Sequence, residues 1–142
     1  MATEKASDDK AYAQLRYMQN VYSQHHELIE EQIATYSLSL DSMRKGVQFL
    51  NDSKQADKKK TLISIGGGAY VEALFPDIRS ALVYVGAGYL VERSVAEAKA
   101  IVEDNKNKQE EMLKKLDAER RKLQSELISI SYRIETMQQQ QV

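Results

Sequence analysis

The fold is decided by the stretch Ile65-Gly66-Gly67-Gly68-Ala69-Tyr70-Val71-Glu72, which returns twenty residues later as Val85-Gly86-Ala87-Gly88-Tyr89-Leu90-Val91-Glu92. Each Gly-x-Gly supplies the positive φ angles that a tight hairpin turn requires. Four runs rich in Val, Ile, Leu and Tyr flank these turns, at about residues 62–65, 69–75, 81–85 and 89–92. Residues 61–93 are therefore predicted to form two β-hairpins.

On either side of the hairpins, apolar residues recur at alternating spacings of three and four, which is the period of an amphipathic helix. The first predicted helix covers residues 10–53, with Asp8 or Asp9 as a candidate N-cap. The second covers residues 94–138, and its opening Ser94 and Glu97 have the spacing of a capping box. The expected class is α+β, mainly α. It is a long antiparallel two-helix coiled coil joined by two β-hairpins, within a single domain over residues 1–142.

Each predicted helix interrupts its apolar seam once with two consecutive steps of four, a stutter that locally relaxes a left-handed supercoil. The stutters centre on Ile29 and Leu123. Because both residues stand at similar distances from the hairpins, antiparallel helices should bring the two stutters face to face. Polar Asn105, Gln109 and Glu119 interrupt the second seam, and we hypothesise that they fix its register.

The composition excludes several classes of function. Lys and Arg number 20 against 21 Asp and Glu, so bulk charge gives no route to nucleic acid or to an anionic membrane. The chain has no cysteine, which excludes disulfides, thiolate metal sites and thiol nucleophiles. We find neither a signal peptide nor an apolar stretch of about 20 residues, so we expect a cytoplasmic protein without a membrane partner. No nucleophile, base and orienting group converge, so neither enzyme activity nor a cofactor is predicted.

Three motifs could also indicate a specific binding site rather than a structural role. The glycines could cradle a phosphate, but neither Gly-x-Gly is followed by a third glycine or by Gly-Lys-Ser/Thr, so hairpin turns are favoured. His25 and His26 point to different sides of a helix and lack neighbours at metal-ligand spacing, so no metal site is predicted and His25 is assigned to the seam. The run Lys58-Lys59-Lys60 could contact an acidic partner, but a solvated linker is favoured.

The two hairpins are incomplete as a fold. Two-stranded hairpins are marginally stable alone, and apolar strands with open edges invite pairing. We therefore expect the segment 61–93 to complete a sheet with other subunits. The residues predicted to carry this association are Ile63, Ile65, Tyr70, Val71, Val83, Val85, Tyr89 and Val91.

At the free ends of both helices, apolar residues spread beyond the seam, whereas residues 103–122 have only Leu113 and Ala118 off the seam. An apolar patch at the end of a charged rod indicates a binding surface, and Met and Tyr suit partners of varied shape. The alternative is that these residues pack inside a wider coiled-coil end. The residues predicted to bind a partner are Tyr12, Leu15, Tyr17, Met18, Val21, Ile128, Ile130, Tyr132, Ile134 and Met137.

The segment from Val85 to Ala98 resembles the second hairpin and helix entry of α-class subunits of the chaperone prefoldin, and Ile63 to Ala73 resembles the first hairpin. The resemblance implies a hexamer of two α and four β subunits whose hairpins form a double β-barrel body. It also implies that coiled-coil arms hold unfolded proteins at their tips, without ATP, for transfer to a group II chaperonin. Ser64 stands where the family often has Pro, and Phe75-Pro76 replaces a polar turn.

Two other classes of function stay open at this point. The first is a structural or scaffolding coiled-coil oligomer that binds one folded partner, and the second is an enzyme that binds phosphate at the glycine turns. A scaffold should ignore denatured proteins, whereas a chaperone should capture them. A nucleotide titration would reveal the enzyme.

Overall fold

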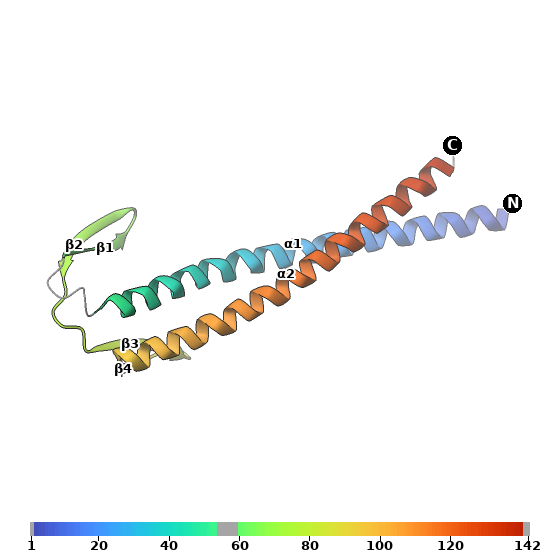
Figure 1. Cartoon of the computed structure of the whole chain (residues 1–142). Coiled ribbons are helices and arrows are strands. Elements are labelled where there is room, and N and C mark those ends of the chain that lie inside the picture. The colour runs from blue at the N-terminus through green and yellow to red at the C-terminus, as the bar shows by residue number, and fades with distance from the viewer. Residues whose placement is uncertain (1, 54–59, 141–142) are drawn as a thin grey trace. The chain divides into compact units, whose positions relative to one another are not determined.

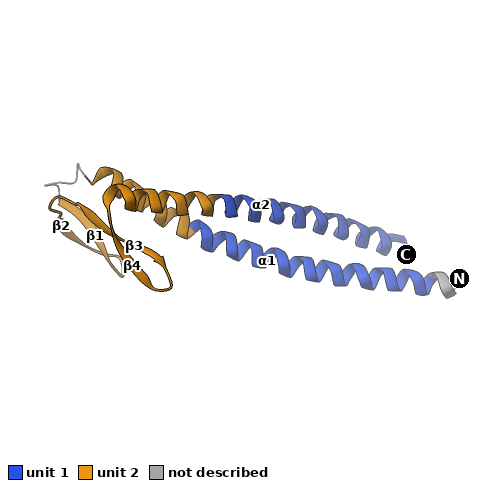
Figure 2. Ribbon diagram, turned by 90° about the horizontal axis from the view of Figure 1, so that it is seen from below, with its two compact units in different colours: residues 1–37, 111–142 blue, residues 38–110 orange. Residues whose placement is uncertain are grey.

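The computed structural model describes residues 2–53 and 60–140. Helix α1 (Ala2–Asp52) is followed by strands β1 (Lys60–Gly66), β2 (Ala69–Leu74), β3 (Ser80–Gly86) and β4 (Tyr89–Ser94), and then by helix α2 (Val95–Gln140) (Figure 1). The expected class, two long helices joined by two antiparallel hairpins, is confirmed. Figure 2 colours two compact units, Met1–Ser37 with Glu111–Val142 and Leu38–Glu110. The single domain over residues 1–142 stays a prediction.

Helix α1 begins earlier than the sequence pattern indicated. It starts at Ala2 rather than at residue 10, and Asp8 and Asp9 lie inside it instead of capping it. The segment before residue 10 contains neither Gly nor Pro. Once a helix is nucleated, each added residue gains one hydrogen bond at little cost, so the helix continues toward the N-terminus.

Helix α2 begins with the predicted capping box. The Glu97 amide donates to Ser94 Oγ at 3.2 Å, and the Ser94 amide donates to Glu97 Oε2 at 3.2 Å. These two bonds satisfy backbone donors that an uncapped helix leaves without partners. The lysine run before the first strand is only partly described, because Lys58 and Lys59 lie outside the described residues. Lys60 opens β1 and pairs with Glu72 across the hairpin at 3.1 Å.

In the first unit, α1 and α2 lie side by side and antiparallel, with the first turns of α1 and the last turns of α2 at the same end (Figures 1 and 2). Ile29, Leu116 and Leu123 form one buried cluster, so the two stutters do face each other. Near the chain ends, Gln138 Nε2 donates to the Tyr12 hydroxyl at 2.9 Å. The register of the two helices is therefore fixed by apolar clusters together with cross-helix hydrogen bonds.

Polar residues on the α2 seam find partners on α1. His25 Nε2 lies 3.3 Å from Glu119 Oε1 in the first unit. In the second unit, Ser39 Oγ donates to Gln109 Oε1 at 3.3 Å. Asn105, by contrast, is exposed. Two of the three polar residues expected to fix the register thus make contacts that a shifted register would lose.

The second unit contains both hairpins. The pairs β1–β2 and β3–β4 form two separate two-stranded sheets with the same register, so that Ile63 faces Val71 and Val83 faces Val91. Each strand pair carries a register irregularity before its turn, between Ser64 and Gly66 and between Tyr84 and Gly86. The repeat seen in the sequence is thus a repeat in structure.

The turns have the predicted backbone conformation. Gly67 and Gly68 have φ angles of 59° and 77°, and Ala87 and Gly88 have 49° and 80°. Both turns therefore use the left-handed region at two consecutive residues, as tight hairpin turns do. Ala87 occupies a conformation that disfavours a Cβ atom, whereas its counterpart in the first hairpin is a glycine.

The loop between the hairpins packs on the end of α1. The rings of Phe49 and Phe75 meet edge to face, with centroids 5.6 Å apart and an interplanar angle of 72°. This arrangement suits the charge distribution of aromatic rings. Phe75 thus holds the loop against the helix. Nearby on α1, a hydrogen bond from Lys45 to Asp41 raises the pKa of the lysine.

Candidate functional site

The structure sorts the predicted tip residues into three groups by burial. Leu15, Ile130 and Ile134 are buried and form one cluster in the seam. Tyr12, Met18 and Met137 are partly buried and pack against that cluster. The remaining four are exposed, namely Tyr17, Val21, Ile128 and Tyr132. The buried three support the end of the coiled coil from within, so the exposed and partly buried residues form its accessible apolar surface.

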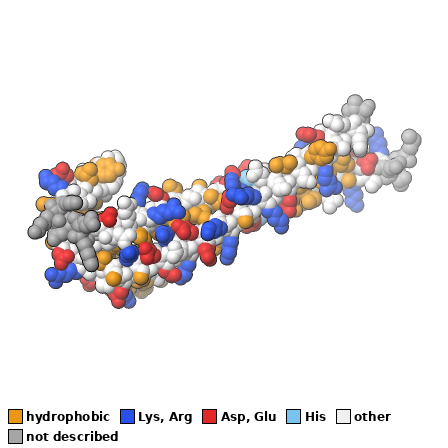
Figure 3. Space-filling model, viewed as in Figure 1, with side chains coloured by type: hydrophobic (Ala, Val, Ile, Leu, Met, Phe, Trp, Pro, Cys, Tyr) orange, Lys and Arg blue, Asp and Glu red, His pale blue; other side chains and the backbone are white. Residues whose placement is uncertain are grey.

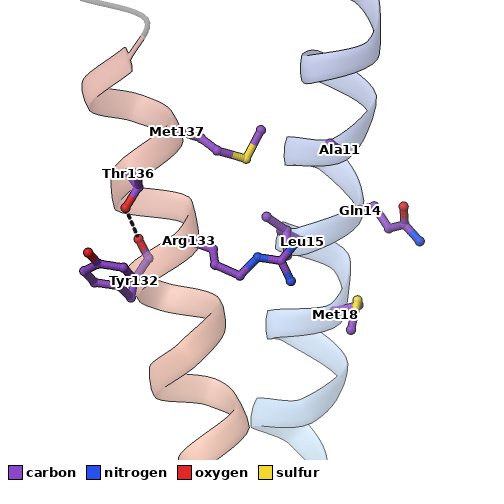
Figure 4. Close-up of a pocket in the computed structure, with 8 residues that line it drawn as sticks. All are labelled: Ala11, Gln14, Leu15, Met18, Tyr132, Arg133, Thr136 and Met137. Atoms are coloured by element: carbon purple, nitrogen blue, oxygen red, sulfur yellow. Dashed lines mark hydrogen bonds between the residues drawn. The ribbon is translucent and has the colours of Figure 1, made fainter.

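An open groove of about 550 Å³ between the helices is lined in part by four of these residues, Leu15, Met18, Tyr132 and Met137. Its lining alternates between the two helices (Figure 4), with Ala11, Gln14, Leu15 and Met18 from α1 and Tyr132, Arg133, Thr136 and Met137 from α2. Met137 points from α2 toward α1, and Tyr132 points away from α1 (Figure 4). Flexible thioethers from both helices give the groove a surface that adapts to the shape of a ligand.

Two exposed apolar residues of α1 lie on the same helix face as residues that line this groove. On α1, Tyr17 and Val21 lie three residues after Gln14 and Met18, which line the groove, and residues three or four apart share one helix face. On α2, Ile128 lies four residues before the lining residue Tyr132 but also three before Ser131, which bonds to Gln19 on the other side of the tip, so Ile128 stands at the outer edge. We call the groove lining, together with Tyr17, Val21 and, at its outer edge, Ile128, the apolar face.

The other side of the tip is polar. A second groove, of about 460 Å³, is lined by Arg16, Gln19, Asn20, Ser23 and Leu127. Arg16 and Asn20 each follow a lining residue of the first groove by two positions, which places them about 200° around α1. Gln19 Nε2 donates to Ser131 Oγ at 3.1 Å on α2. The tip therefore has one apolar and one polar side, which the sequence analysis did not distinguish.

Charged residues cover the helices away from the tip. On the face drawn in Figure 3, side chains of both signs alternate along the helices. Asp117 pairs with Arg120 at 2.7 Å and with Arg121 at 2.9 Å. Arg121 is exposed, whereas Asp117 and Arg120 are half-buried. Exposed pairs of this kind contribute little stability. Exposed apolar residues also occur away from the tip, such as Leu28 and Leu38.

No group of three or more His, Cys, Asp or Glu side chains gathers at a possible metal site among the described side chains of residues 5–53 and 60–140. His25 instead pairs with Glu119, a carboxylate from the other helix that helical spacing alone did not reveal. His26 lies 3.8 Å from Glu30 on its own helix. Neither described helix is apolar enough over a sufficient length to cross a bilayer.

The hairpins present a second apolar surface. Of the residues predicted to carry association, six are exposed: Ile63, Ile65, Tyr70, Val71, Val85 and Tyr89. Val83 is only 7% exposed, and its partner Val91 is half-buried, so this pair faces its own chain. The opposite face of the same hairpin carries exposed residues that the sequence analysis missed, namely Leu82, Tyr84 and Leu90. Their alternation with Val83 and Val91 is the signal that could have found them.

Comparison with known proteins identifies the family. The sequence matches the family model described as prefoldin subunit over residues 22–140. The chain therefore belongs to the prefoldin family, a family of chaperone subunits.

The curated relatives place it in the α class. Prefoldin subunit alpha of Pyrococcus horikoshii is 25% identical over 96% of this chain and 93% of its own length. Prefoldin subunit alpha of Methanocorpusculum labreanum is 29% identical over 97% of this chain and 95% of its own length. The fold is shared with filamentous PFD from Methanocaldococcus jannaschii, solved by cryo-EM. That chain has a TM-score of 0.53 and 22% identity, covering 85% of this chain and 95% of that one. The resemblance inferred from the hairpin sequences is confirmed.

Proposed function

We propose that this chain is a subunit of an ATP-independent holdase of the cytoplasm, which binds unfolded polypeptides at the tips of its coiled-coil arms and prevents their aggregation. The observation that carries the proposal is the apolar face. Flexible and aromatic side chains remain exposed there, although a buried cluster directly beneath them already closes the coiled coil. A surface that the chain does not need for its own packing is available to a partner.

The apolar face suits weak and reversible binding. Tyr17, Ile128 and Tyr132 are 71%, 65% and 71% exposed, so each still has most of its surface to bury. Fully burying one large side chain contributes about 1.5–3 kcal/mol, and ordering costs offset part of this. One arm therefore holds a client weakly. Several arms acting on the same flexible client raise the overall affinity through effective concentration.

We further propose that the hairpins complete a β-barrel body with prefoldin β subunits and a second α subunit, in an assembly of two α and four β subunits. Support comes from the two separate two-stranded sheets, each with exposed apolar side chains. Isolated hairpins are marginal in water, so such surfaces gain stability when strands from other subunits pair with them. Client transfer to a group II chaperonin belongs to the same proposal. An open, shallow binding face supports it, because clients can be released without a chemical step.

The test is suppression of aggregation of a chemically denatured protein by the full chain assembled with a prefoldin β subunit. Tyr17→Ser combined with Ile128→Ser should reduce protection several-fold, because both residues are exposed and their loss removes only accessible apolar surface. The matched control is Leu28→Ser combined with Leu38→Ser, which removes exposed apolar side chains away from the tip. Equal loss in both variants would contradict a site at the tip. No protection by the unaltered assembly would favour the scaffolding alternative.

A further inference from the structure

The groove on the apolar face has one charged lining residue, Arg133. Its side chain extends from α2 toward α1, across the level of Leu15 (Figure 4). Among the described residues that line the groove, none carries a carboxylate. The groove therefore combines an apolar floor with a single positive charge.

Arg133 differs from the arginines along the rest of the helices. Arg44 pairs with Glu110 at 3.2 Å, and Arg120 and Arg121 both pair with Asp117. Among the side chains that the structure describes, those of residues 5–53 and 60–140, no carboxylate forms a salt bridge with Arg133. A guanidinium group has donors in a fixed fork that matches a carboxylate in two parallel hydrogen bonds. The groove thus offers an anion-binding group that no described residue of the chain uses.

Resting on the proposed function, we infer that the preferred client is an apolar segment flanked by Asp or Glu. Its aliphatic or aromatic side chains occupy the floor formed by Leu15, Met18 and Met137, and its carboxylate pairs with Arg133. The volume of about 550 Å³ accommodates a few side chains of such a segment. The opposite side of the tip also has an arginine, Arg16. It lies among Gln19, Asn20 and Ser23 and contacts the Tyr12 ring, so it lacks a comparable apolar floor.

Two fluorescent peptides with the same apolar core test this preference, one flanked by Glu and the other by Lys. Their affinities for the full chain, assembled with a prefoldin β subunit, are measured by fluorescence anisotropy. An exposed ion pair strengthens binding by about two- to five-fold, so the Glu-flanked peptide should bind more tightly by that factor. The difference should shrink as the salt concentration rises, because both charges are solvent-accessible.

Arg133→Gln should remove the preference while keeping most of the affinity for the Lys-flanked peptide. Arg16→Gln makes the same charge change on the polar side of the same tip and should leave the preference intact. Equal binding of both peptides by the unaltered assembly would overturn the inference, as would a preference that survives Arg133→Gln. These results leave the proposed function standing. If both peptides bind and Tyr17→Ser combined with Ile128→Ser leaves their affinities unchanged, the proposed function itself is contradicted.

Discussion

The left-handed residue in the second turn makes a quantitative prediction possible. Ala87 has a φ of 49°, and Gly67, its counterpart in the first turn, has a φ of 59°. A Cβ atom in the left-handed region costs about 1–2 kcal/mol. Replacing alanine with glycine relieves this strain but costs about 0.5–1 kcal/mol of stability, because glycine loses more backbone freedom on folding. Ala87→Gly should therefore stabilise the β3–β4 hairpin by about 0.5–1 kcal/mol.

The first hairpin supplies the reciprocal experiment. A Cβ atom built on Gly67 meets no heavy atom within 4 Å, so Gly67→Ala changes the backbone preference without adding a clash. It should destabilise the β1–β2 hairpin by a similar amount. Each substitution should leave the other hairpin unchanged, because the two sheets are separate.

Amide hydrogen exchange measures the two hairpins independently. A change of about 0.5–1 kcal/mol alters opening equilibria by about two- to five-fold. Ala87→Gly should slow exchange of the amides in β3 and β4 by this factor, and Gly67→Ala should speed exchange in β1 and β2. Faster exchange in β3 and β4 after Ala87→Gly would show that residue 87 is not left-handed, and the argument from the repeated turn would fail.

Three further predictions concern assembly and stability. Leu82→Lys with Leu90→Lys adds charge to the exposed face of the second hairpin and should prevent assembly with β subunits while circular dichroism retains its helical signal; unchanged sedimentation would contradict this. Ser94→Ala should destabilise the start of α2 by about 1 kcal/mol through loss of the cap, with Ser125→Ala at an exposed position inside α2 as a near-neutral control in urea unfolding. Leu123→Ala should cost about 2–4 kcal/mol in the same assay, because it opens a cavity where the two stutters meet, and a cost below about 1 kcal/mol would mean that Leu123 is not packed against Ile29.

The secondary structure followed from the sequence because local signals agreed with one another. The Gly-x-Gly repeat specified both turns, and Ser94 with Glu97 specified the start of α2. The start of α1 was missed because residues 2–9 contain no helix breaker, so the pattern offered no boundary, and the acidic residues 8 and 9 resembled a cap. Phe75 packing against Phe49 was not predictable, since the two lie far apart in sequence.

The candidate site was predicted as a set of residues but not as a surface. Helical spacing identified the apolar residues of both tips, yet it could not say which were buried, because this depends on how α2 is aligned with α1. Contacts such as that between Tyr12 and Gln138 set the alignment. In this alignment Leu15, Ile130 and Ile134 are buried between the helices, whereas Tyr17, Val21, Ile128 and Tyr132 are exposed. In β3 both faces are apolar, so alternation separates Leu82 and Tyr84 from Val83 but does not show which of the two faces lies inward.

The central claim, that clients bind on the apolar face of the tip, is tested most directly by site-specific crosslinking. The chain has no cysteine, so each introduced thiol is unique. Thr136→Cys places a thiol in the groove on the apolar face, and Ser23→Cys places one in the groove on the polar side. With a photoactivatable thiol reagent and a denatured client, residue 136 should give a strong crosslink and residue 23 a weak one. Equal crosslinking at both positions, or stronger crosslinking at residue 23, would contradict the account.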